Sequence, residues 1–112
     1  MTRVKSVAAI KHRKIKKEAR GFKHARRKRV KTAKEALLHS GQYAYIGRRL
    51  RKRDLRRLWT IRINAAARNE GLSYSKFINA LKNNKVEIDR KMLADIAVKD
   101  SKTFKKIVDV VK

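Results

Sequence analysis

The stretch that most constrains the fold of this chain covers residues 48–68, and its character changes along its length. Side chains three or four positions apart share one face of a helix. One such face carries Arg48, Lys52, Leu55, Trp59, Ile63 and Ala66. This face is cationic where it begins and apolar where it ends, so the pattern predicts a single helix that begins beside a negatively charged partner and ends inside a protein core.

Charge is distributed unevenly on the two sides of this stretch. Residues 1–58 contain 22 Lys and Arg and 3 Asp and Glu, a net charge of +19, whereas residues 59–112 contain 12 and 6, a net charge of +6. Like charges at this density repel one another in a small chain, which favours a polyanionic partner. The partner classes that this charge allows are a nucleic acid, an anionic membrane surface and an acidic protein.

The composition excludes several other classes of protein. The sequence contains no cysteine, which rules out a disulfide framework and a Cys-ligated zinc site. No apolar run approaches the roughly 18–20 residues that cross a bilayer, and residues 1–5 lack the apolar core of a secretory signal. We therefore expect a cytosolic protein, or one made inside an organelle, with no membrane partner.

The sequence offers no set of side chains with the spacing of an active site. His12, His24 and His39 are too far apart to form a metal-binding pair on a helix, and no carboxylate cluster accompanies them. Ser73 and Ser75 have no nearby histidine to activate a hydroxyl. We predict no catalytic residue, no metal site and no cofactor, and an enzyme is the least supported function class.

The first half of the chain predicts helices that have no core of their own. Residues 11–20 favour a short helix that Gly21 would end, and too few apolar side chains accompany it to offset the entropy of ordering. Residues 23–70 favour one long helix, bent or broken near Gly41 or Gly47. We expect this arm to be loose when free and ordered against another molecule when bound.

The second half predicts a small compact domain built from helices. Ser73, Asp89 and Asp100 are candidate N-caps because their side chains can accept hydrogen bonds from the first turn of a helix. The apolar side chains expected to form one core with Trp59, Ile63 and Ala66 are Tyr74, Phe77, Ile78, Leu81, Met92, Leu93, Ile96, Phe104, Ile107, Val108 and Val111. The predicted fold is all-α, with a long basic helical extension (residues 1–58) followed by a compact helical domain (residues 59–112).

The basic arm points to binding of a phosphate backbone, since each cation that neutralises a phosphate releases counterions. Arginine-rich helices with scattered aromatic residues suit folded RNA, and the spacings of zinc fingers and leucine zippers are absent. Phe22, Tyr43 and Tyr45 are candidates either for stacking on unpaired bases or for packing against protein. Asn64 is expected either to bond a neighbouring backbone or to contact RNA. The alternative functions are a nonspecific nucleoid-associated or other basic RNA- or DNA-binding protein, and a protein of the membrane surface.

The residues that we predict to bind RNA are cations and two tyrosines of the arm, with two arginines of the following domain. They are Arg3, Lys5, Lys11, Arg13, Lys14, Lys16, Lys17, Arg20, Lys23, Arg26, Arg27, Lys28, Arg29, Lys31, Tyr43, Tyr45, Arg48, Arg49, Arg51, Lys52, Arg53, Arg56, Arg57, Arg62 and Arg68.

Five motifs carry a resemblance to a known family. They read GQYAY at residues 41–45, RRLRKR at 48–53, RINAAAR at 62–68, GLSYSKFIN at 71–79 and VEIDRKMLADIAV at 86–98. Together with the dipeptide LW at residues 58–59, they strongly resemble the bacterial L20 family of large-subunit ribosomal proteins. The resemblance covers essentially the whole chain.

This resemblance implies a fold and a function. The fold would be all-α, with a basic N-terminal extension and a globular C-terminal domain. The protein would be a structural constituent of the ribosome that binds 23S ribosomal RNA, helps early assembly of the 50S subunit and contacts neighbouring large-subunit proteins. In some family members the C-terminal domain also represses translation of its own messenger RNA. No homo-oligomer is expected.

Overall fold

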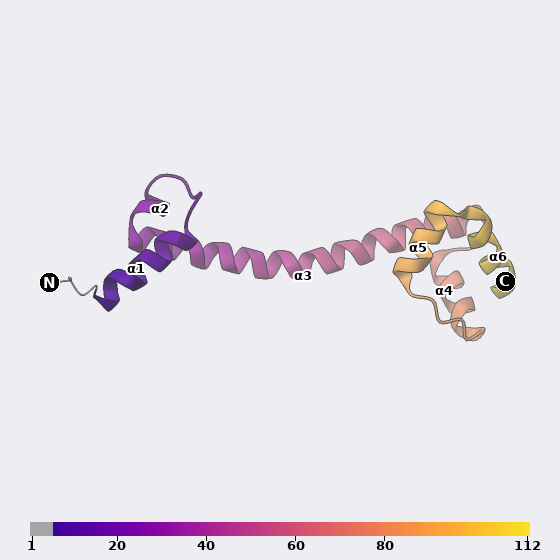
Figure 1. The fold of residues 1–112 in the computed structure, drawn as a ribbon. Helices are drawn as coiled ribbons and strands as arrows, with labels where there is room; N and C mark the ends of the chain where they lie inside the picture. The colour runs from indigo at the N-terminus through magenta and orange to yellow at the C-terminus, as the bar shows by residue number, and fades with distance from the viewer. Residues whose placement is uncertain (1–5) are drawn as a thin grey trace. The chain divides into compact units, whose positions relative to one another are not determined.

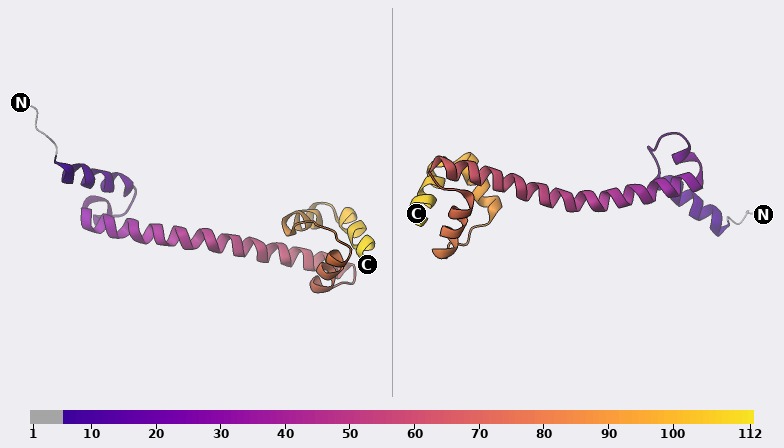
Figure 2. Two further views of the ribbon diagram at one scale, coloured as in Figure 1. Left: turned by 90° about the horizontal axis from the view of Figure 1, so that it is seen from below. Right: turned by 180° about the vertical axis from the view of Figure 1, so that it is seen from behind.

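The computed structural model describes residues 6–112, and this part of the chain contains helices and no strand (Figures 1 and 2). The helices are α1 (Val7–Glu18), α2 (Ala25–Lys28), α3 (Val30–Asn69), α4 (Tyr74–Asn83), α5 (Arg90–Lys99) and α6 (Ser101–Val111). This composition confirms the predicted all-α class. The chain divides into two compact units, Met1–Arg49 and Leu50–Lys112, and α3 contributes to both.

In the first unit, α1 begins and ends with ordinary capping interactions. The Ser6 hydroxyl accepts a hydrogen bond of 3.2 Å from the backbone N–H of Ala9. After the helix, Gly21 has a φ of +85°, a left-handed conformation that costs glycine no steric strain. The helix ends at Glu18, slightly before the predicted residue 20, and it starts at Val7, earlier than the predicted residue 11.

The predicted long helix over residues 23–70 is wrong at its beginning, and it is not broken at Gly41 or Gly47. His24 has a φ of +51° and Arg29 has extended dihedrals, so the short helix α2 is separate from α3. Downstream, α3 runs without interruption through Gly41 and Gly47, neither of which has a positive φ. Each glycine costs only about 1 kcal/mol in a helix, and with no proline in the chain the flanking helix-forming residues outweigh that cost.

In the second unit, α4, α5 and α6 gather beside the C-terminal part of α3 (Figures 1 and 2), and α6 packs against both α4 and α5. The rings of Phe77 and Phe104 meet in the core, with centroids 5.4 Å apart and planes tilted by 47°. The buried residues of this core are Ile63, Ala67, Phe77, Leu81, Leu93, Ala94, Phe104, Val108 and Val111.

The predicted core of the second unit is largely confirmed, with one correction. Trp59 and Ala66 are half-buried and pack against the buried cluster, as expected from the face that turns apolar along α3. Met92, in contrast, is 56% exposed, and the smaller Ala94 is buried. The spacing of apolar residues predicts which side of α5 faces inward, but several adjacent positions lie on or near that side. Packing against the neighbouring helices determines which of these side chains is buried.

The caps of the second unit are also partly as predicted. Asp89 accepts a hydrogen bond of 2.8 Å from Met92 N–H, and Asp100 accepts one of 3.1 Å from Thr103 N–H. Ser73 stands at the N-cap of α4, but its hydroxyl makes no capping bond. The N–H of Tyr74 donates instead to Oδ1 of Asn64, 3.2 Å away. Asn64 thus joins α3 to the start of α4, which confirms the hydrogen bond to a neighbouring backbone.

Candidate nucleic-acid interface

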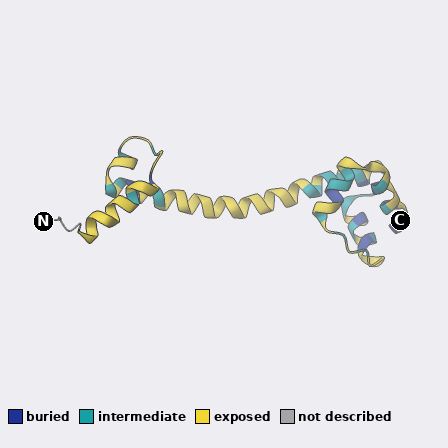
Figure 3. Cartoon of the chain, in the orientation of Figure 1, coloured by how far each residue is buried: buried dark blue, intermediate teal, exposed yellow. Residues whose placement is uncertain are grey.

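The middle of α3 is an exposed helix. Every residue from 38 to 58 is exposed, and burial begins at Trp59 (Figure 3). An isolated helix of this kind gains no stability from packing of an apolar face. Its composition explains what it can contact, because residues 48–57 contain seven Lys and Arg and one Asp.

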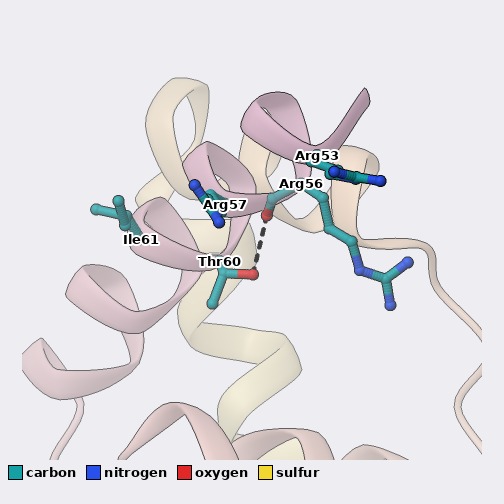
Figure 4. Close-up of a pocket in the computed structure, with 5 residues that line it drawn as sticks. All are labelled: Arg53, Arg56, Arg57, Thr60 and Ile61. Carbon is teal, nitrogen blue, oxygen red and sulfur yellow. Dashed lines mark hydrogen bonds between the residues drawn. The ribbon is translucent and has the colours of Figure 1, made fainter. Parts of the chain in front are cut away.

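In the second unit, three arginines of this segment flank a shallow hollow of about 540 Å³ (Figure 4). Arg53, Arg56 and Arg57 line it together with Thr60 and Ile61. The Thr60 hydroxyl donates a hydrogen bond of 2.9 Å to the carbonyl oxygen of Arg56, so its donor is already used within the helix. The hollow therefore presents guanidinium groups to the solvent as its main polar groups.

The arginines of the hollow have few acidic partners within the described part of the protein. Arg57 Nη1 lies 3.9 Å from Oδ1 of Asp54, and both side chains are mostly exposed. Exposed pairs of this kind contribute about 0–1 kcal/mol. Within residues 6–112 no carboxylate lies within ion-pair distance of Arg53 or Arg56. Guanidinium groups that are unpaired and planar are suited to bidentate binding of phosphate.

In the first unit, one predicted stacking residue is occupied by protein. The guanidinium carbon of Arg49 lies 4.3 Å from the centroid of the Tyr45 ring, and Arg49 also hydrogen-bonds the Tyr45 hydroxyl. One face of the Tyr45 ring is therefore covered. Tyr43 is 71% exposed. Of the two tyrosines, Tyr43 has the more accessible ring for stacking on a base.

The remaining predicted RNA-binding residues occupy α1, α2, the intervening loop and α3. Arg62 is half-buried and Arg68 is exposed. Arg3 and Lys5 lie outside the described residues. The exposed cations upstream are Lys11, Arg13, Lys14, Lys16, Lys17, Arg20, Lys23, Arg26, Arg27, Lys28, Arg29 and Lys31. Their exposure leaves their charge available to a polyanion, while their roles stay predictions.

The sequence reasoning missed a groove of about 600 Å³ in the first unit. Its wall on α3 includes Glu35, His39 and Tyr43, which follow one another at a spacing of four residues and so share a helix face. Phe22, Lys23 and Arg26 line it from the segment before α3. The four-residue spacing was readable in the sequence, but the return of Phe22 onto this face required the structure.

The described part of the chain offers neither a metal site nor a membrane-spanning helix. No group of three or more His, Asp or Glu in residues 6–112 is arranged to hold a metal ion. Among the same residues, no helix combines the length and the apolar character needed to cross a bilayer.

Comparison with known proteins decides the family. The family model described as Ribosomal protein L20 matches residues 3–107. The chain belongs to this family. Its membership confirms the resemblance carried by the sequence motifs and makes the chain a structural, non-enzymatic ribosomal protein.

Two curated members of the L20 family are similar over most of their length. "Large ribosomal subunit protein bL20" of Vesicomyosocius okutanii subsp. Calyptogena okutanii is 55% identical over 105 residues, which cover 94% of this chain and 88% of the relative. The protein of the same name from Caldanaerobacter subterraneus subsp. tengcongensis is 53% identical over 114 aligned positions, covering 100% and 96% respectively. The exposed basic segment of α3 and the compact second unit both fall within the matched regions.

Proposed function

We propose that this L20-family chain is a structural constituent of the large ribosomal subunit that binds 23S ribosomal RNA directly. The observation that carries the proposal is the exposed middle of α3, residues 38–58, where cations are concentrated and every side chain is exposed. A surface of this kind is costly in isolation because like charges repel one another. Binding to phosphates removes that cost.

The two parts of the chain have different roles in this proposal. Residues 1–58 lie between RNA helices and neutralise phosphates that would otherwise repel, with release of counterions as the driving force. Residues 59–112 dock on a defined RNA surface and set the direction of the arm. Arg49, Arg53, Arg56, Arg57 and Arg68 contact RNA near the junction of the two parts.

This division also supports a role early in assembly of the subunit. Bringing two RNA helices together requires that their phosphate charge be neutralised, and a chain that carries +19 within residues 1–58 supplies that neutralisation.

Neighbouring large-subunit proteins are expected to cover apolar side chains that the second unit leaves exposed, such as Ile61 and Val110. Repression of its own messenger would require that the messenger present the same RNA surface to residues 59–112.

The test is selectivity of the full chain for RNA. Labelled 23S rRNA is titrated with the protein at about 0.3 M salt, where nonspecific contacts are weakened, in the presence of excess duplex DNA. Selective binding supports a ribosomal RNA ligand. Equal competition by duplex DNA would favour the alternative, a nonspecific nucleoid-associated protein. Competition by an RNA copy of the chain's own messenger leader tests repression in the same assay.

A further inference from the structure

The groove of the first unit combines chemical groups that phosphate binding alone does not explain. It has a volume of about 600 Å³, within the roughly 300–1,000 Å³ of small-molecule sites. Two aromatic side chains, two cations and one carboxylate line it: Phe22, Tyr43, Lys23, Arg26 and Glu35. The carboxylate is the unexpected member of this set.

Glu35 is one of few acids in a strongly basic part of the chain. Residues 1–49 contain 17 Lys and Arg and only 2 acids. Within residues 6–112, no Lys, Arg or His nitrogen lies within ion-pair distance of Glu35. A carboxylate in this position repels a phosphate. Its ligand is therefore expected to be a part of the RNA that donates hydrogen bonds, since an ionised carboxylate is purely an acceptor.

Among the four RNA bases, guanine fits a carboxylate best. Its Watson–Crick edge carries two adjacent donors, N1–H and the N2 amino group, which match the two oxygens of one carboxylate. Adenine and cytosine offer one amino group beside a ring nitrogen that accepts, and uracil offers one N–H between two carbonyl oxygens. Edges of this kind are accessible only when the base is unpaired, as in loops and bulges.

The other side chains of the groove complete such a site. Tyr43 is 71% exposed and Phe22 is half-buried, so aromatic surface is available for the face of a base. Lys23 and Arg26 are exposed cations on the same groove and can bind the phosphates on either side of the nucleotide. The base and the phosphates beside it thus each have a complementary group.

We infer that this groove binds an unpaired guanine of the RNA, with Glu35 accepting hydrogen bonds from guanine N1–H and N2 and Tyr43 stacking on the base. The inference rests on the proposed function, because it names the nucleotide that an RNA-binding chain selects. The nucleotide is part of a strand rather than a free mononucleotide, since Lys23 and Arg26 serve flanking phosphates.

The test compares pentaribonucleotides that differ at one atom group. Fluorescein-labelled UUGUU, UUIUU and UUUUU are titrated with the full chain at about 0.3 M salt, which suppresses nonspecific phosphate contacts. Inosine keeps N1–H and lacks only the N2 amino group of guanine. The expected result is that UUGUU binds about fivefold or more tighter than UUIUU, the lower range for a bidentate base contact. Unlabelled GMP is expected to compete only weakly.

Two charge-matched variants separate base recognition from overall charge. Glu35→Gln and Glu18→Gln each remove one acid from the first unit, so both are expected to raise the affinity for UUUUU, which has no guanine to contact Glu35. Only Glu35→Gln is expected to abolish the preference for guanine over inosine. Photo-crosslinking of UU(6-thioG)UU followed by mass spectrometry is expected to label residues 22–43.

The possible results distinguish the two proposals. Equal binding of UUGUU and UUIUU, or a crosslink outside residues 22–43, would overturn the guanine site and leave binding of ribosomal RNA intact. The same loss of preference in both variants would also overturn it. Competition by GMP at the concentration of UUGUU would show a mononucleotide site, contrary to the inference. Absence of binding to any RNA, including 23S rRNA, would overturn both proposals.

Discussion

Arg49 lies across the ring of Tyr45, with its guanidinium carbon 4.3 Å from the ring centroid, and its Nη2 donates a hydrogen bond of 2.6 Å to the Tyr45 hydroxyl oxygen. The two residues are four positions apart on α3, where side chains meet. Both side chains are exposed, so the Arg49 guanidinium would otherwise be mobile. The contact with Tyr45 fixes its direction. Tyr45 is thereby a positioning residue for Arg49 in our account.

Tyr45→Ala is expected to weaken binding to 23S rRNA by about two- to tenfold, because an unconstrained Arg49 loses about 0.5–1.5 kcal/mol of side-chain freedom on binding. Tyr45→Phe keeps the ring and should have a smaller effect. The measurement is fluorescence anisotropy in wild-type and Arg49→Gln backgrounds. If Tyr45 acts through Arg49, Tyr45→Ala has no further effect once Arg49 is absent. An undiminished effect there would indicate that Tyr45 contacts RNA itself.

The glycines within α3 give a prediction about stability. Apart from the adjacent residues and backbone of α3 itself, no atom of residues 6–112 lies within 4 Å of a Cβ added at Gly41 or Gly47, and neither glycine has a positive φ. Gly41→Ala and Gly47→Ala are each expected to stabilise the helix by roughly 0.5–1 kcal/mol, seen as higher helicity in circular dichroism. Gly21→Ala is the matched control, since its φ of +85° strains an alanine. A loss of helicity in the α3 variants would mean that the helix bends at these glycines.

The bond from Tyr74 N–H to Asn64 links α3 to α4 in the second unit. Asn64→Ala leaves this half-buried N–H without its partner and is expected to destabilise the unit by about 1–3 kcal/mol. Asn64→Asp keeps an acceptor at the same position and should be closer to wild type. Urea unfolding monitored by Trp59 fluorescence measures both. Equal stability of wild type and Asn64→Ala would show that the bond contributes nothing.

The N-cap of α6 predicts a dependence on pH. Hydrogen bonds from Thr103 hold the pKa of Asp100 below its ordinary value, because they favour the charged carboxylate. A group whose pKa is lower in the folded state stabilises the fold above its unfolded pKa, and this contribution is lost as the pH falls through the folded value. The Asp100→Asn variant should therefore lose less stability than wild type on acidification, as measured by thermal unfolding. Parallel pH profiles would contradict this.

The sequence was most informative where a structure depends on neighbouring residues. Asp89 and Asp100 cap helices through bonds to residues three positions away, so their role is visible locally. Ser73 looks equally suitable, yet Asn64 of another helix supplies the bond to the first turn of α4. The use of Asn64 in place of Ser73 depends on how the helices pack. The residue types at the start of a helix do not reveal that packing.

The candidate site was predictable to a similar extent. Charge density marked the exposed part of α3, since 22 cations cannot be paired by 3 acids in residues 1–58. The groove of the first unit was not predicted, because it depends on a positive φ at His24 and on the separation of α2 from α3. The pairing of Tyr45 with Arg49 was also missed, although their four-residue spacing permits it.

The most direct measurement of the central claim is the salt dependence of binding to 23S rRNA. A triple variant removes three charges from α3 and introduces glutamine, which has a similar helix propensity. Its substitutions are Arg53→Gln, Arg56→Gln and Arg57→Gln. The control Lys99→Gln, Lys102→Gln, Lys105→Gln removes three exposed charges from residues 99–105. If the exposed segment of α3 binds phosphates, the slope of log K against log salt becomes less negative by about 2 in the arginine variant, as three lost contacts require, and stays unchanged in the control. An unchanged slope in the arginine variant, or an equal change in both, would contradict the account.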